Sequence, residues 1–69
     1  MPTIHQRLAK NIRSQMAKKK MTAERLALEI DKDKGHLSRI LSGQKHASLD
    51  LVALIADALK VDVEDLFSR

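Results

Sequence analysis

The side chains best suited to chemistry in this 69-residue chain are basic, and they gather in one part of the sequence. Residues 1–46 hold eleven Lys or Arg against four Asp or Glu, whereas residues 47–69 hold two against five. Basic residues grouped on one side of a small protein bind polyanions, of which nucleic acid is the commonest. The alternative is a merely solvated basic surface, and charge alone does not separate the two.

The three histidines do not have the spacing of a metal site. His5, His36 and His46 show no paired spacing, and no cysteine accompanies them, so we expect neither a metal nor a cofactor. His36 and His46 are better interpreted as neutral polar contacts. No nucleophile, base and orienting residue are grouped, and no glycine-rich phosphate loop is present. The sequence therefore argues against an enzyme.

Length and composition predict a single small domain over residues 1–69. The absence of cysteine excludes disulfides and agrees with a reducing cytoplasm. No signal-peptide pattern and no apolar run of about 20 residues is present, so we expect a soluble, intracellular protein without a membrane span. Phe67 is the one aromatic residue and strand-favouring clusters are missing, which favours an all-α fold.

Capping residues and apolar periodicity predict five helices. Their expected spans are about 4–19, 22–30, 34–41, 49–59 and 63–67. Their expected N-terminal caps are Thr3 (in a capping box with Gln6), Thr22, Asp33, Ser48 and Asp62. The expected core positions are Ile4, Leu8, Ile12 and Met16 in the first helix, Leu26, Ala27 and Ile30 in the second, Leu37, Ile40 and Leu41 in the third, and Leu49, Val52, Ile55, Ala56 and Leu59 in the fourth. Gly43 is expected to be left-handed just beyond the third helix.

The second and third helices form the arrangement that carries function. Both are short, about three residues separate them, and the third has a polar outer face. Such a helix-turn-helix, here about residues 22–41, places its second helix in the major groove of DNA.

Several stretches together resemble the Cro/cI-type helix-turn-helix family. They are Met21 to Ala27 (MTAERLA), Leu37 to Ile40 (LSRI), Ser42-Gly43, Ser48-Leu49 and Asp57 to Phe67 (DALKVDVEDLF). The resemblance covers essentially the whole chain. It implies a five-helix, lambda-repressor-like domain that binds double-stranded DNA, usually as a homodimer, and regulates transcription. The sequence departs from the family at Ala23, where a glutamine commonly contacts phosphate, and at Asp31, which replaces the usual turn glycine.

Carried onto this chain, the resemblance assigns two sets of DNA contacts. The base-reading residues are Lys34, Gly35, Ser38 and Arg39, with His36 close enough to contribute. The phosphate contacts are Thr22, Ala23, Ser42, Gln44, Lys45 and His46. Helical phase supports the first set, because it faces away from Leu37, Ile40 and Leu41. Arg39 has the planar fork that pairs with guanine O6 and N7, although Gly35 leaves one reading position without a side chain.

We expect a homodimer, because a single half-site gives little affinity. Leu51, Leu54 and Ala58 make a separate stripe at i, i+3 and i+7, and with Val63 and Phe67 they form the expected interface. Two-fold symmetry would set the recognition helices about 34 Å apart, which suits a palindromic operator and a repressor. The alternative function is an antitoxin-type module that also binds a protein partner, through surplus apolar surface at Leu28, Leu51 and Leu54.

One pair of core positions also departs from the family, which often has an arginine and a glutamate there, joined as an ion pair. Here the two positions hold Met16 and Leu41, and we expect their side chains to touch. Replacing such a pair by apolar residues is often neutral or stabilising.

Overall fold

The computed structural model describes residues 3–68, which form five α-helices and, within that range, no strand. The helices are α1 (Ile4–Lys19), α2 (Ala23–Glu29), α3 (Lys34–Leu41), α4 (Leu49–Leu59) and α5 (Val63–Phe67). The predicted all-α fold is confirmed, and every helix boundary lies within about one residue of its expected position. None of the described helices is long and apolar enough to cross a bilayer.

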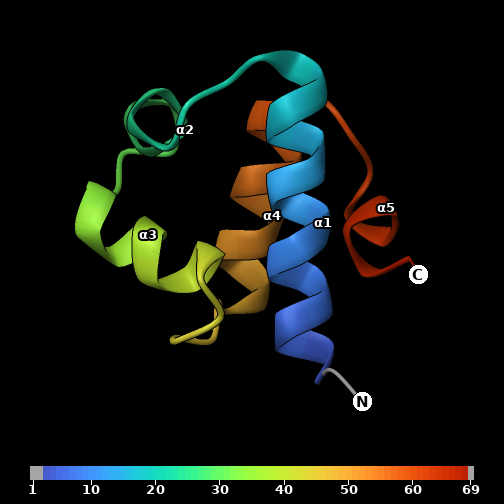
Figure 1. The fold of residues 1–69 in the computed structure, drawn as a ribbon. Coiled ribbons are helices and arrows are strands. Elements are labelled where there is room, and N and C mark those ends of the chain that lie inside the picture. The colour runs from blue at the N-terminus through green and yellow to red at the C-terminus, as the bar shows by residue number, and fades with distance from the viewer. Residues whose placement is uncertain (1–2, 69) are drawn as a thin grey trace.

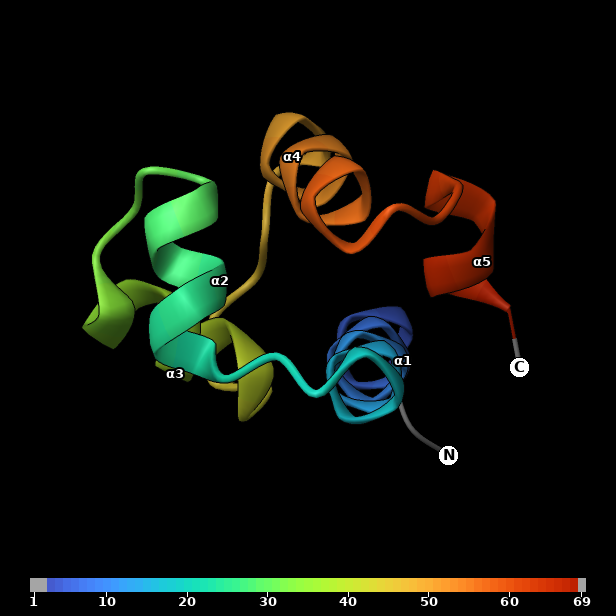
Figure 2. The same ribbon diagram turned by 90° about the horizontal axis from the view of Figure 1, so that it is seen from above.

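Helix α1 is the longest helix, with α4 behind it, α2 and α3 on one side of it and α5 on the other (Figure 1). It packs against α3, α4 and α5, while α2 packs against α3 and α4. Figure 2 looks down α1, with α2 and α3 on one side of it and α5 on the other. The helix-turn-helix is therefore carried by a scaffold made of α1, α4 and α5.

Side-chain caps begin the first four helices where the sequence predicts them, whereas the Asp62 side chain makes no cap hydrogen bond at α5. The Thr3 hydroxyl accepts from the Gln6 amide at 3.2 Å, and the Gln6 side chain accepts in turn from the Thr3 amide at 2.9 Å. The Ser48 hydroxyl accepts from the Leu51 amide at 3.2 Å. A cap of this kind is worth about 1 kcal/mol, so local sequence defines the helix starts independently of tertiary packing.

The core is one aliphatic cluster to which all five helices contribute. Its largest fully buried side chains are Ile12, Leu26, Leu37, Val52, Ile55, Leu59 and Leu66. The Asn11 side chain adds a polar tie, donating to the main-chain oxygen of Leu66 at 2.8 Å. This bond attaches the last helix to α1, across 55 positions of sequence.

Two expected core positions are wrong. Ile4 and Leu49 are exposed, Leu49 to 76%, whereas Leu51, which was expected on the surface, is 6% exposed and belongs to the core. Helical periodicity puts Leu49 and Leu51 at opposite edges of the apolar stripe of α4. The packing of the neighbouring helices determines that the Leu51 edge is buried, and the sequence of α4 alone does not contain the positions of those helices.

Candidate nucleic-acid interface

The turn between α2 and α3 is held by backbone geometry and by burial. Asp31 adopts the left-handed conformation, with φ of 55°, which Asp tolerates better than most residues. The Lys32 amide donates to the Ala27 oxygen at 3.0 Å, and Ile30 at the end of α2 is buried in the core. An aspartate thus occupies the turn position that the family usually gives to glycine.

Helix α3 separates into a buried and an exposed face. Leu37, Ile40 and Leu41 are buried. The expected base-reading residues Lys34, Gly35, Ser38 and Arg39 are exposed, and His36 is half-buried at the edge between the faces. The structure therefore brings the expected reading residues together on one open helix surface.

Helix α3 begins at an aspartate cap with a glycine beside it. The Asp33 side chain accepts from the His36 amide at 3.1 Å and so caps the helix. A Cβ added at Gly35 would lie 2.9 Å from the Asp33 carboxylate oxygen, which is too close for both to keep their places. A side chain at position 35 would therefore make the Asp33 carboxylate shift, and Gly35 leaves its own position on the exposed face of α3 without a side chain.

The loop after α3 folds back over the end of that helix. The Arg39 carbonyl accepts from the Gln44 amide at 2.9 Å, from the Lys45 amide at 3.2 Å and from the Ser42 hydroxyl at 3.0 Å. Gly43 has φ of 82°, as expected of the left-handed residue beyond a helix end. The side chains of Ser42, Gln44, Lys45 and His46 are all exposed, so the expected phosphate contacts lie beside the reading face.

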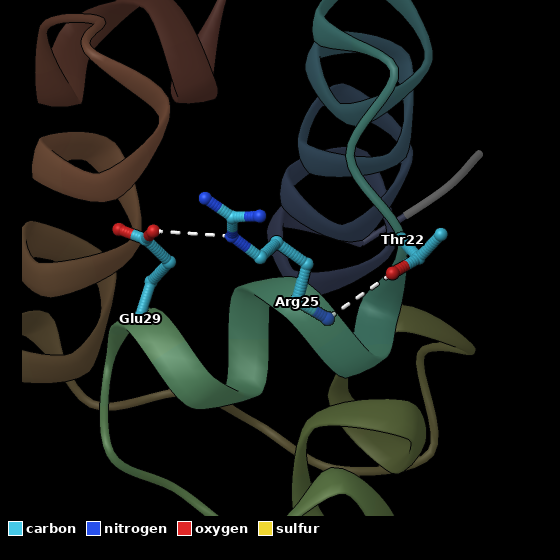
Figure 3. Close-up of polar contacts among 3 residues, drawn as sticks. All are labelled: Thr22, Arg25 and Glu29. Atoms are coloured by element: carbon cyan, nitrogen blue, oxygen red, sulfur yellow. Dashed lines mark hydrogen bonds and ion pairs between the residues drawn. The ribbon is translucent and has the colours of Figure 1, made fainter.

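The start of α2 supplies the remaining expected phosphate contacts. Thr22 is exposed and Ala23 half-buried. The Thr22 hydroxyl caps the helix by accepting from the Arg25 amide at 3.1 Å (Figure 3). On the same helix, Arg25 Nε lies 3.3 Å from Glu29 Oε1 in an exposed ion pair (Figure 3). Such a pair contributes only a few tenths of a kcal/mol, but it gives Arg25 a protein partner.

Two contacts beside the interface were missed from the sequence. The Arg13 guanidinium on α1 donates to the main-chain oxygen of Leu41. The rings of His5 and His46 stack, with centroids 3.4 Å apart and planes 8° from parallel. Arg13 lies one turn before Met16, which the sequence places near Leu41 of α3. This spacing is the one feature of the sequence that indicates that Arg13 lies near α3. The histidine pair had no signal, since most of the domain separates the two residues in sequence.

The expected dimer residues divide between core and surface. Leu51 is buried within the domain, so its assignment to an interface is wrong. Leu54 is 45% exposed, Val63 is exposed, and Ala58 and Phe67 are half-buried. Leu54 and Val63 also line an open groove of about 420 Å³ between α4 and α5, together with Ala53, Ala56, Asp57, Val61 and Asp62.

Comparison with known proteins shows what this fold is similar to. Residues 12–66 match the helix-turn-helix family model. A crystal structure of the clp gene regulator ClgR from Corynebacterium glutamicum is similar with a TM-score of 0.91 and 32% identity, covering 96% of this chain and 86% of that one. A second ClgR crystal structure gives the same score and identity over 94% of this chain and 69% of that one.

A more distant likeness concerns the fold alone. The restriction-modification controller protein C.AhdI from Aeromonas hydrophila has a TM-score of 0.87 at 24% identity, over 91% of this chain and 96% of that one. No curated protein sequence matches the chain. The family match over most of the chain and the ClgR identity agree, and the chain belongs to the Cro/cI-type helix-turn-helix family of DNA-binding transcriptional regulators.

Proposed function

We propose that this protein is a repressor that binds a palindromic operator as a homodimer and reads base edges with the exposed face of α3. The observation that carries the proposal is the division of that helix. Leu37 and Ile40 are buried in the core. The opposite face, with Lys34 and Arg39, is exposed, and its side chains are free to contact DNA.

The chemistry of that face suits the major groove. The Arg39 guanidinium can donate two parallel hydrogen bonds to guanine O6 and N7, a pairing that discriminates against other bases by about 1–3 kcal/mol. Lys34 reaches the same acceptors or a phosphate, and Ser38 can donate to or accept from either strand. His36 and Gly35 lie at the edge and the start of the same surface.

Phosphate contacts would come from both sides of α3. Ser42, Gln44, Lys45 and His46 are exposed on the loop after the helix, and Thr22 and Ala23 stand at the start of α2. Contacts of this kind orient the protein and add affinity without adding sequence information. We propose that they hold α3 in the groove while Arg39 and its neighbours read.

The proposed dimer uses the α4 and α5 side of the domain. Leu54 and Val63 offer exposed apolar surface there, and Ala58 and Phe67 are half-buried beside them. One half-site gives little affinity, whereas two-fold symmetry doubles the contacts on sites about 34 Å apart. Occupying such an operator blocks a promoter, and a regulator that does so works in the cytoplasm with the DNA.

The test compares two substitutions across a salt series. Arg39→Ala should reduce the preference for the operator over random DNA, because it removes a base contact. Lys45→Ala should weaken binding to all sequences alike and lower the salt slope by about one unit. Operators would first be isolated from genomic fragments that the protein retains. Equal loss of specific and random affinity in Arg39→Ala would overturn the assignment of the reading face.

A protein-binding module of antitoxin type is the second candidate. Leu28 on α2 is 75% exposed, which would suit a partner. However, Leu51 is buried, Leu28 and Leu54 lie on different helices, and exposed leucines that occur singly are normal on protein surfaces. DNA binding without a protein partner therefore remains the function that the surface supports best.

A further inference from the structure

The first turn of α1 lies against the loop that carries the proposed phosphate contacts. His5 is half-buried and His46 is exposed, and their rings stack face to face, with centroids 3.4 Å apart. A Cβ added at Gly43 would lie 3.7 Å from Gln6 Cγ, so Gly43 of the loop also lies beside α1. The capping box of Thr3 and Gln6 fixes that turn of α1.

The His5–His46 stack contacts the loop at a position where the loop makes no backbone hydrogen bond to α3. The backbone bonds that fold the loop onto α3 end at the Lys45 amide, which donates to Arg39. Ala47 is packed against the core. His46 stands between these two anchors, and its ring rests on His5.

Face-to-face stacking uses the faces of the imidazoles and leaves their edges free. The edge of a histidine ring carries its two nitrogens, and in the neutral ring one of them bears the N–H that can donate to a phosphate oxygen. His46 is exposed, so its edge is open to a ligand while its face is held. A side chain that is ordered before binding loses less conformational entropy when it binds.

We propose that His5 is a positioning residue for DNA, which holds the His46 ring in the orientation that donates to a backbone phosphate. This inference rests on the proposed function, since it assigns His46 to the DNA backbone. It also gives α1, which lies outside the helix-turn-helix, an indirect part in DNA binding. His5 acts through His46 and contributes no sequence preference of its own.

The experiment measures the affinity of the full chain for a random-sequence duplex and for the operator, by fluorescence anisotropy at fixed salt. His5→Ala should weaken both about two- to tenfold, in line with the cost of ordering one side chain. His5→Phe keeps a flat ring under His46 and should retain most of the affinity. In a His46→Ala background, His5→Ala should cause no further loss, because coupled residues are non-additive. Thermal unfolding of each variant separates a loss of binding from a loss of fold.

Three results would overturn the inference while leaving the proposed function intact. They are an unchanged affinity in His5→Ala, an equal loss in His5→Phe, and an additive loss in the double variant. A wild-type chain that binds no duplex would instead overturn the proposed function itself, and the assignment of His5 with it.

Discussion

The Arg13 guanidinium on α1 donates a hydrogen bond to the main-chain oxygen of Leu41, the last residue of α3. That oxygen is one of the four carbonyls at the end of α3 that the helix itself leaves unpaired. The positive charge also lies at the negative end of the helix dipole. The Arg13 side chain therefore joins α1 to the end of α3, the helix that we propose reads DNA.

Removing the Arg13 contact should loosen that end of α3. We expect Arg13→Ala to lower the free energy of unfolding by about 1 kcal/mol, the net value of a hydrogen bond of this type, with the exposure of Arg13 keeping the effect small. Lys10→Ala removes an exposed positive charge from the same helix and serves as the control. Urea denaturation measures both. An equal effect of the two substitutions would show that the hydrogen bond contributes nothing beyond charge.

Met16 and Leu41 stand where the family often has an ion pair, and both are buried in the same core cluster. Their direct contact stays a prediction. A charge placed there alone would be desolvated without a partner, so Met16→Arg should lower the free energy of unfolding by about 3 kcal/mol or more. Met16→Leu keeps the volume and should cost less than about 1.5 kcal/mol. Adding Leu41→Glu should restore part of the loss, and thermal unfolding of the three variants checks this. A fully stable Met16→Arg would contradict the assignment of an apolar α1–α3 contact.

Local sequence determined most of this fold. Thr3, Thr22, Asp33 and Ser48 cap the helices that they were expected to cap, because a cap involves only residues three positions apart. The exposed face of α3 was likewise predictable, since three buried positions at helical spacing leave one direction for Arg39. These features need no knowledge of how the helices pack.

The features that the sequence could not predict depend on packing between distant segments. Leu49 and Leu51 flank the stripe of α4 equally, and only the other helices decide that Leu51 is covered. His5 and His46 stack because α1 passes beside the loop after α3. Apolar periodicity within a helix does not predict this long-range proximity. The contact between Arg13 and a main-chain oxygen is also invisible in sequence, because every residue has such an oxygen.

Gly35 and Asp33 should be energetically coupled. Gly35→Ala gains helix propensity of up to about 1 kcal/mol, but its Cβ would come within 2.9 Å of the Asp33 carboxylate and disturb a cap worth about 1 kcal/mol. We therefore expect little net change in the wild-type background. In an Asp33→Ala background the cap is already absent, and Gly35→Ala should stabilise by about 1 kcal/mol. A double-mutant cycle by urea denaturation measures the coupling. Equal stabilisation in both backgrounds would show that the carboxylate moves aside at no cost.

The proposed dimer can be tested with two leucines of α4. Leu54 is 45% exposed and lines the groove between α4 and α5, whereas Leu49 is 76% exposed in the first turn of the same helix, outside the proposed interface. Leu54→Asp would place an unpaired charge in an apolar contact, so we expect the dimer dissociation constant to rise by about thirtyfold, the effect of losing roughly 2 kcal/mol at an interface. Leu49→Asp should leave the dimer dissociation constant unchanged.

Sedimentation over a concentration series measures the association. Binding to a whole and a half operator shows whether DNA affinity changes together with dimerisation. A wild-type chain that stays monomeric on and off DNA would reject the dimer, and equal dissociation of the two variants would place its interface elsewhere on α4.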